Sequence, residues 1–244
     1  MKVLIDADSI IYIAAAQKKG EKYKTLKKAK KQVDSIIDTI MSKTRGSEYL
    51  VVLTLSRCFR YNIFPEYKIH RKKLEKPEHF DAIKAYIIKK CRAFSVDTLE
   101  ADDVVRVLSK QIQDSIIASP DKDILQLKGT HFNYKSNLFH TTTELEASTY
   151  FWNNMITGQS GDGIKGIAGK GPAYAKNLFN ETMLNGDMRS IVFHEYIKAY
   201  GEYKGIEEFY KNYKCLYILE EFGIPIPEFI TYKHKDLWEI EENI

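Results

Sequence analysis

The hydrophobic residues form three short, nearly continuous runs that are separated by longer and more polar segments. The runs are KVLI at residues 2–5, YLVVLTL at residues 49–55 and SIIAS at residues 115–119. Continuous apolar runs of this length are typical of parallel strands that are covered on both faces. Residues 131–140 (HFNYKSNLFH) suit a further pair of strands. The sequence therefore predicts a sheet with a buried, parallel centre.

The segments between these runs place hydrophobic residues three and four positions apart, as on one face of a helix. Three segments show this spacing: residues 27–41, 81–94 and 99–112. Alternation of strands and helices predicts an α/β fold, in which right-handed crossovers connect the strands of a mostly parallel sheet. After residue 152 a glycine-rich stretch follows, and then an aromatic part with helical patterns.

Acidic residues stand where the predicted strands end and where one predicted helix begins. Asp6 and Asp8 follow the first hydrophobic run, and Asp121 and Asp123 follow the third. Three more acids occupy the first turn of the predicted helix 99–112, which Thr98 would cap: Glu100, Asp102 and Asp103. Because ligands bind open parallel sheets outside the carboxyl ends of the strands, we expect these acids to share one edge of the sheet.

Carboxylates that are brought together must take up protons or share a cation. A set of oxygen ligands suits Mg²⁺ or Mn²⁺ better than zinc. Two such ions, about 4 Å apart, would activate a water and stabilise the leaving oxygen of a phosphodiester. Each acidic cluster alone has a simpler explanation, since acids favour helix N-termini and aspartates favour turns. The convergence of three clusters is what favours a metal site.

Length and charge limit the range of functions only weakly. The 244 residues allow one large domain or a core with a smaller appendage, and the formal net charge is +4. Lysines are nevertheless concentrated in residues 17–31 and 68–76. The first of these stretches is more typical of the solvated face of a helix, and contact with phosphate is the alternative.

Nothing in the sequence predicts a secreted or membrane-bound protein. The three cysteines are scattered and lack the spacing of a metal or redox motif. No hydrophobic run approaches the length of a signal peptide core or a membrane span. We therefore expect a cytoplasmic monomer with reduced thiols and no membrane partner, located in the host cytoplasm if a phage encodes it.

Residues 158–178 (GQSGDGIKGIAGKGPAYAKNL) gather glycines and lysines around a single acid, Asp162. Four glycines precede a predicted helix that starts with Pro172: Gly163, Gly166, Gly169 and Gly171. Three lysines lie among and after them: Lys165, Lys170 and Lys176. Glycine allows the backbone to approach a ligand closely, and a helix N-terminus binds phosphate. The alternative is a loop that only turns a corner.

The order of the motifs resembles the bacteriophage and bacterial 5′→3′ exonuclease family, which belongs to the flap endonuclease superfamily with a PIN-like nuclease core. The motifs that carry the resemblance lie between residues 3 and 178: VLIDADSI, FRYNIFPEYKIHR, TLEADDVV, IIASPDKDIL and TGQSGDGIKGIAGKGPAYAKNL. The resemblance implies a PIN-like core over residues 1–152, with a short arch region at about 68–95. It also implies a helix–three-turn–helix and C-terminal helical region over residues 153–244.

The resemblance further implies the roles of individual residues. Two divalent ions would be held by Asp6, Glu100, Asp102, Asp103, Asp121, Asp123 and Asp162. Lys68 and Arg71 would contact the scissile phosphate, and Tyr67 would stack on a base. The helix–three-turn–helix would grip duplex DNA, often with a K⁺ ion held by backbone carbonyls, through Gly163, Lys165, Gly166, Gly169, Lys170, Gly171 and Lys176.

The sequence departs from the family pattern in two places. The family carries an acid at the end of the second strand, where residues 53–56 read LTLS. In the glycine-rich motif, Gln159 replaces an aspartate and Gly163 replaces an asparagine. These departures predict a site with fewer anionic ligands and weaker metal affinity. Asp8 has no counterpart in the family pattern and is left outside the predicted ligand set.

The leading hypothesis is a structure-specific 5′ nuclease that hydrolyses phosphodiesters in DNA or RNA–DNA during replication or repair. One alternative is a branched-DNA-binding protein with a weakened metal site, which the missing acids favour. Another alternative is a PIN-type ribonuclease, against which the glycine-rich motif argues.

Overall fold

The fold is built around a six-stranded sheet in the order β5-β4-β3-β1-β2-β8. The structure is a computed structural model, and it describes residues 1–16, 24–73, 75–179 and 183–232. The strands are β1 (Lys2–Asp6), β2 (Glu48–Val52), β3 (Ile116–Ala118), β4 (Gly129–Asn133), β5 (Leu138–Thr142) and β8 (Ile230–Thr231). β1 to β4 are mutually parallel, and only the edge strands β5 and β8 are antiparallel to their neighbours. The predicted α/β fold with a mostly parallel sheet is confirmed.

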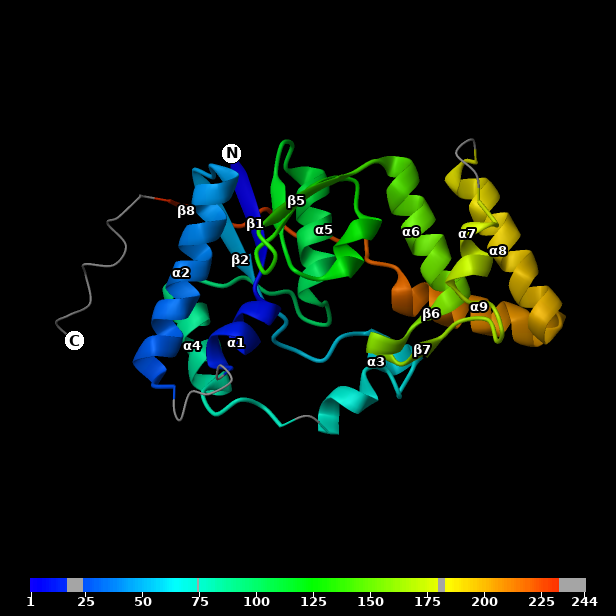
Figure 1. The fold of residues 1–244 in the computed structure, drawn as a ribbon, viewed down its shortest axis with the longest axis horizontal. Helices are drawn as coiled ribbons and strands as arrows, with labels where there is room; N and C mark the ends of the chain where they lie inside the picture. Colours follow the sequence, from blue (N-terminus) through cyan, green and yellow to red (C-terminus); the bar gives the residue numbers. More distant parts are fainter. Residues whose placement is uncertain (17–23, 74, 180–182, 233–244) are drawn as a thin grey trace.

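Helices cover both faces of the sheet, as Figure 1 shows. On one face lie α1 (Asp8–Ala15), α2 (Leu26–Thr44) and α4 (Phe80–Lys90), and on the other lies α5 (Ala101–Gln111). Successive residues of β1 point to opposite faces of the sheet. Val3 packs with the first group of helices, and Leu4 packs with α5. Strands buried on both faces explain why their sequences are continuously hydrophobic.

The described part of the basic stretch forms the start of α2. Thr25 caps this helix, and its hydroxyl oxygen accepts the N–H of Lys28 at 3.3 Å. Ala29 and Val33 face the core, whereas Lys27 and Lys31 are exposed. This arrangement is the solvated helix face that the sequence favours, and residues 17–23 lie outside the described part of the chain.

A second group of helices extends from one end of the core and has its own aromatic interior. It consists of α6 (Glu144–Thr157), the short α7 (Pro172–Lys176), α8 (Asn185–Tyr200) and α9 (Glu202–Leu216), and α3 (Arg60–Ile63) packs against α9. Trp152 and Phe209 stack at 6.3 Å between ring centroids within this group. Pro172 stands at the start of α7 with Gly171 as the N-cap, as predicted.

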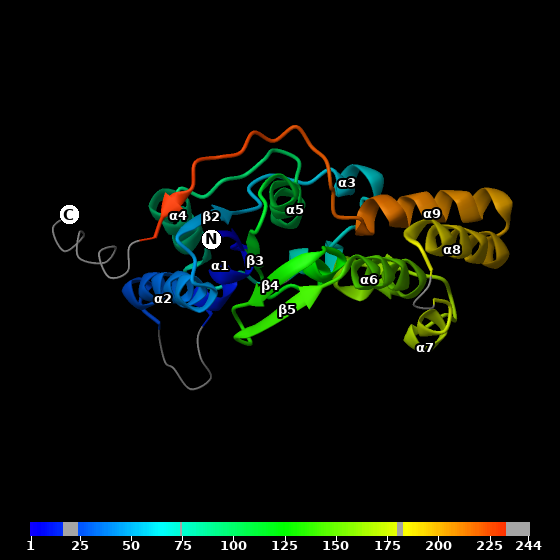
Figure 2. The ribbon, with the colours of Figure 1, turned by 90° about the horizontal axis from the view of Figure 1, so that it is seen from above.

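The chain returns to the central sheet after α9. Figure 2 shows residues 217–229 running back across the core to β8, which pairs antiparallel with β2. Ile218 and Ile224 fill the core on the α5 side of the sheet. The sequence predicted a helical C-terminal region, so this extended return is a difference from expectation. Within the described residues, no helix combines the length and the apolar character needed to cross a membrane.

Candidate metal and nucleic-acid site

Asp6 ends β1 and is only 6% exposed at the carboxyl edge of the sheet. Its carboxylate accepts the Ser119 hydroxyl at 2.9 Å and the backbone N–H of Asp8 at 3.2 Å. Burial and the nearby charge of Asp8 raise the pKa of Asp6 to about 7. A buried carboxyl group with this pKa readily exchanges its proton for a metal cation.

The segment that follows β3 brings a second pair of acids to the same edge. Asp121 accepts the backbone N–H of Asp123 at 3.0 Å, where the 3-10 turn η2 (Lys122–Gln126) begins. Asp123 accepts the side-chain amide of Gln159 and, at 3.4 Å, the hydroxyl of Tyr150. Burial and the charge of Asp121 raise the pKa of Asp123 to about 6, although the Gln159 hydrogen bond acts in the opposite direction. Gln159 therefore faces one of the predicted metal ligands.

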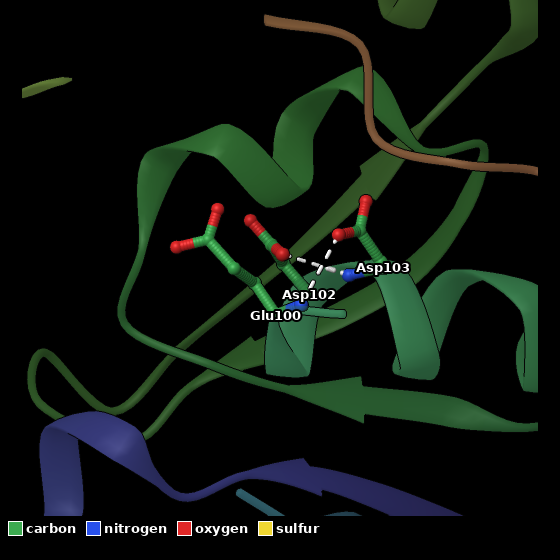
Figure 3. A group of neighbouring side chains, drawn as sticks. All are labelled: Glu100, Asp102 and Asp103. Carbon is green, nitrogen blue, oxygen red and sulfur yellow. Dashed lines mark hydrogen bonds between the residues drawn. The ribbon is translucent and has the colours of Figure 1, made fainter. Parts of the chain in front are cut away.

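The start of α5 carries Glu100, Asp102 and Asp103, which spread to different sides in Figure 3. Glu100 is the N-cap residue, so the predicted cap at Thr98 is wrong; Thr98 has a φ of 65° in the left-handed region. Burial and the charges of Asp103 and Glu100 raise the pKa of Asp102 well above its usual range. The Asp102 carboxylate is therefore stabilised by binding either a proton or a metal cation.

Asp103 is held by Arg60 rather than directed to the other acids. The Arg60 guanidinium donates to both oxygens of Asp103, at 2.6 and 2.7 Å. The same carboxylate accepts the backbone N–H of Leu219 at 3.0 Å and that of Glu100 at 3.2 Å. The oxygens of Asp103 come within 4.8 Å of those of its two acidic neighbours, yet they are already bonded and fully buried. These bonds indicate a positioning role for Asp103 through Arg60, and its metal contact stays a prediction.

Lys68 places its ammonium group among the acids. Its side chain is 13% exposed, and Nζ lies 2.5 Å from Glu100 and 3.6 Å from Asp162. The backbone of Lys68 has a φ of 52°, and its N–H donates to the carbonyl of Asp162 at 2.9 Å. Non-glycine residues in this conformation are strained and concentrate at functional sites. Burial alone raises the pKa of Glu100, but the charges of Lys68 and Arg60 outweigh it and hold that pKa below its usual range.

Asp162 joins the glycine-rich segment to the acids. It ends the turn η3 (Ser160–Asp162) and accepts the Arg71 guanidinium at 2.9 Å and the Tyr67 hydroxyl at 3.2 Å. Tyr67 also donates to Glu100 at 2.8 Å, and it is only 1% exposed. Base stacking by Tyr67 was therefore a wrong expectation, because the ring lies inside the protein and its hydroxyl bridges two carboxylates.

An open groove of about 680 Å³ adjoins these side chains. Its lining includes Arg71, Asp121, Asp123, Gln159 and Asp162. Arg71 is 51% exposed, so its guanidinium is available to a ligand in the groove. A separate cavity of about 430 Å³ lies away from the acids, between α5, α6 and α9.

The backbone of the glycine-rich segment packs closely against the backbone at the end of α6. A side chain on Gly166 would place Cβ 2.2 Å from the carbonyl oxygen of Ile156, which only glycine avoids. Gly163 takes a φ of 75° directly after Asp162. The two-stranded pair β6 (Gly158–Gln159) and β7 (Ile164–Lys165) holds the turn together.

The three lysines of this segment differ in their surroundings. Lys165 and Lys176 are exposed. Lys170 instead lies 2.5 Å from Glu195 and over the ring of Tyr174, whose hydroxyl also donates to Glu195. Its charge is therefore already balanced, and the predicted phosphate contact of Lys170 is not supported by this arrangement.

The donor set fits a hard divalent cation such as Mg²⁺ or Mn²⁺. The side chains that approach one another are carboxylates, and burial together with mutual repulsion raises the pKa of Asp6, Asp102, Asp123 and Asp162. Oxygen ligands under such repulsion are stabilised by a cation of this kind. The three cysteines are unpaired and buried, and they take no part in the cluster.

Comparison with known proteins agrees with the resemblance in the motifs. Residues 1–152 match the family described as 5′-3′ exonuclease, N-terminal resolvase-like domain. A 5′-3′ exonuclease of Mycoplasmopsis pulmonis (strain UAB CTIP) is 34% identical over 140 residues, which are 50% of this chain and 46% of that protein. A 5′-3′ exonuclease of Buchnera aphidicola subsp. Acyrthosiphon pisum (strain APS) is 30% identical over 129 residues, 47% of this chain and 44% of that protein. The chain thus spans about half the length of the curated relatives it matches.

Solved structures share the fold at low identity. Bacteriophage T5 5′-exonuclease with bound zinc has a TM-score of 0.58 at 17% identity, covering 88% of this chain and 86% of that one. A T5 flap endonuclease complex with DNA and metal ions has a TM-score of 0.55 at 14% identity, covering 88% and 98%. The catalytic core of Rad2 with DNA has a TM-score of 0.54 at 14% identity, covering 90% and 74%. Because the family match covers more than half of the sequence, the chain belongs to the family of the 5′-3′ exonuclease N-terminal resolvase-like domain.

Proposed function

We propose that the chain is a structure-specific 5′ nuclease that hydrolyses phosphodiester bonds near 5′ ends or flaps in DNA or RNA–DNA. One observation carries the proposal. Carboxylates from the end of β1, the segment after β3, the start of α5 and the glycine-rich segment meet beside a groove that a guanidinium also lines. The relatives described as 5′-3′ exonucleases, and the DNA and metal ions in the T5 complex, support the same reaction class.

The proposed metal ligands are Asp6, Glu100, Asp102, Asp121, Asp123 and Asp162. They would hold one or two Mg²⁺ or Mn²⁺ ions, which supply Lewis-acid stabilisation of charge on the phosphate. Asp103 and Arg60 fix the start of α5, from which Glu100 and Asp102 project. The Tyr67 hydroxyl orients Glu100 and Asp162 by hydrogen bonds to both.

Lys68 and Arg71 are proposed to contact the scissile phosphate. Arg71 is half-exposed and borders the groove, so it can donate to a phosphate oxygen without leaving Asp162. Lys68 balances the buried acids before the substrate arrives, and its ammonium lies near enough to share its charge with an incoming phosphate. Both would stabilise negative charge that develops on the phosphate oxygens.

We further propose that the glycine-rich segment, with α6 and α7 on either side, is a helix–three-turn–helix that grips duplex DNA. The exposed Lys165 and Lys176 would contact phosphates, and the backbone around Gly163, Gly166, Gly169 and Gly171 would approach the duplex and hold a K⁺ ion through its carbonyls. The division into residues 1–152 and 153–244, the arch at about 68–95, the monomeric state and the cytoplasmic location belong to the same proposal.

A branched-DNA-binding protein with little activity is the second candidate. It is favoured by Gln159, whose neutral amide faces Asp123 where the family pattern has a carboxylate. A site with one charge fewer would bind metal more weakly and still hold DNA.

The distinguishing experiment uses 5′-labelled flap, nicked duplex, blunt duplex and structured RNA, each with Mg²⁺, Mn²⁺ or EDTA. The proposal predicts divalent-dependent cleavage close to the 5′ end of the DNA substrates. Tight binding without cleavage in either metal would support the second candidate. Cleavage of RNA alone would support a PIN-type ribonuclease.

A further inference from the structure

The end of β2 offers no carboxylate to the acidic site. Leu53 is 1% exposed and packs in the core, so its side chain points away from the site. Thr54 is the residue whose side chain faces the start of α5, and its Oγ1 accepts the backbone N–H of Ala101 at 2.9 Å. The position beside Glu100 that the second strand could fill is therefore occupied by a hydroxyl group.

Asp8 brings a carboxylate to this position from another element. It is the first residue of α1, two residues beyond Asp6, and its Oδ1 accepts the backbone N–H of Thr54 at 2.9 Å. The pairing of β1 with β2 makes this reach possible, because the N–H of Ala7 donates to the carbonyl of Val52 at 3.0 Å.

The carboxylate of Asp8 lies between two parts of the acidic site. The N–H of Asp8 donates to the Asp6 carboxylate at 3.2 Å. Thr54, whose N–H binds the Asp8 carboxylate, also accepts the N–H of Ala101, the residue after Glu100. The helix dipole at the start of α1 stabilises a negative charge at this residue but does not explain why the carboxylate turns to the end of β2. We propose that Asp8 supplies the anionic metal ligand that β2 lacks, so that the site retains the charge that residues 53–56 (LTLS) do not provide.

This inference rests on the proposed function, because it assigns Asp8 to the same metal site. A purely structural role is the competing explanation, in which Asp8 only accepts the N–H of Thr54. Asp8→Asn separates the two roles, since the amide oxygen still accepts that N–H while the charge is removed. Asp81→Asn is the matched control, because Asp81 also lies in the first turn of a helix but is exposed and pairs with the exposed Lys76 at 3.7 Å.

The first measurement is Mn²⁺ binding to the full chain by electron paramagnetic resonance, together with the melting temperature of each variant without metal. We expect Asp8→Asn to raise the apparent Kd for Mn²⁺ by roughly 10–100-fold, as for residues that shape metal sites. Its melting temperature without metal should not fall, since one buried charge that repels its neighbours is removed. An unchanged Kd, or a lower melting temperature with unchanged Kd, would overturn the proposal in favour of the structural role.

The second measurement moves the carboxylate to the strand where the family pattern has it. Thr54→Asp in the Asp8→Asn background offers an acceptor to Ala101 and restores one negative charge. We expect it to recover at least part of the lost Mn²⁺ affinity, whereas Thr54→Asn in the same background should recover none. Equal affinity of these two double variants would also overturn the proposal.

Failure of this inference is distinguishable from failure of the proposed function. If Asp102→Asn weakens Mn²⁺ binding and abolishes cleavage while Asp8→Asn changes neither, only the role of Asp8 is wrong. If neither variant alters Mn²⁺ binding and wild type does not cleave, the proposed function itself is wrong.

Discussion

The acidic site at the sheet edge and the glycine-rich segment differ in how they handle charge. At the sheet edge, carboxylates are buried and partly balanced by Lys68 and Arg60. In the glycine-rich segment, Lys165 and Lys176 are exposed, and the backbone is closely packed. Buried charges change reaction energies strongly, whereas exposed charges act mainly on binding and are screened by salt. Substitutions in the two regions should therefore have different kinds of effect.

The largest effect should come from Asp102→Asn at the sheet edge. Removing this carboxylate costs metal occupancy and stabilisation of the transition state together, so single-turnover cleavage of a 5′ flap should fall roughly 1,000-fold or more. Asp81→Asn, on an exposed helix start, should cleave at the wild-type rate. A folded Asp102→Asn variant that cleaves at the wild-type rate would contradict a catalytic role of the buried carboxylates at the sheet edge.

The pH dependence of stability should separate the sheet edge from an ordinary acidic surface. Burial and the charge of Asp8 raise the pKa of Asp6 from 3.8 to about 7, and burial and the charge of Asp121 raise that of Asp123 to about 6. The folded chain then holds protons that the unfolded chain has released, so stability without metal should fall as pH rises from about 4.5 to 7. A tenfold change in proton affinity is about 1.4 kcal/mol, which is roughly 3–6 °C in Tm for a chain of this size.

Saturating Mn²⁺ should reverse this trend, because the cation binds the deprotonated carboxylates. Melting curves at several pH values, with EDTA and with Mn²⁺, provide the test. A metal-free Tm that rises steadily from pH 5 to pH 7 would mean that the acids are not under the repulsion inferred here.

The two regions meet at Gln159, which lies in the glycine-rich segment and donates a hydrogen bond to Asp123. Gln159→Asp should lower the Mg²⁺ concentration for half-maximal cleavage, by up to roughly tenfold. Gln159→Glu is a useful comparison, because it adds the same charge on a longer side chain. An equal or higher Mg²⁺ requirement in both variants would show that the position does not replace a lost ligand.

The smallest effect should come from the lysines of the glycine-rich segment. Lys176→Ala should lower the salt dependence of duplex binding by about 0.9 in the log–log slope, the value of one phosphate contact. Lys170→Ala should leave this slope unchanged, because Lys170 is paired with Glu195. Cleavage at saturating DNA should be nearly normal in both variants. Equal slopes for wild type and Lys176→Ala would contradict a phosphate contact at this residue.

Local patterns in the sequence predicted the centre of the fold well. Hydrophobic runs predicted β1 to β3, helical spacing predicted α2, α4 and α5, and the position of Asp6 after β1 predicted its place at the sheet edge. These features depend on residues near one another in the chain. Because parallel strands share one carboxyl edge, even the meeting of Asp6 with the segment after β3 followed from local signals.

Contacts between distant residues were not predictable in the same way. The buried pair of Arg60 and Asp103 joins residues 43 positions apart, and β8 returns to β2 from the far end of the chain. No local pattern of hydrophobic or charged residues in the sequence predicts either contact. Tyr67 was misassigned for the same reason, because only the folded chain shows its ring inside the protein and its hydroxyl between two acids.

The central claim is that the carboxylates at the sheet edge form one divalent-metal site. The most direct test is electron paramagnetic resonance titration of Mn²⁺ into wild type and Asp102→Asn, with Asp81→Asn as the control. The account predicts saturable binding of one or two ions by wild type and the control, and binding weakened by at least roughly tenfold in Asp102→Asn. No saturable binding by wild type, or equal binding by all three proteins, would contradict it.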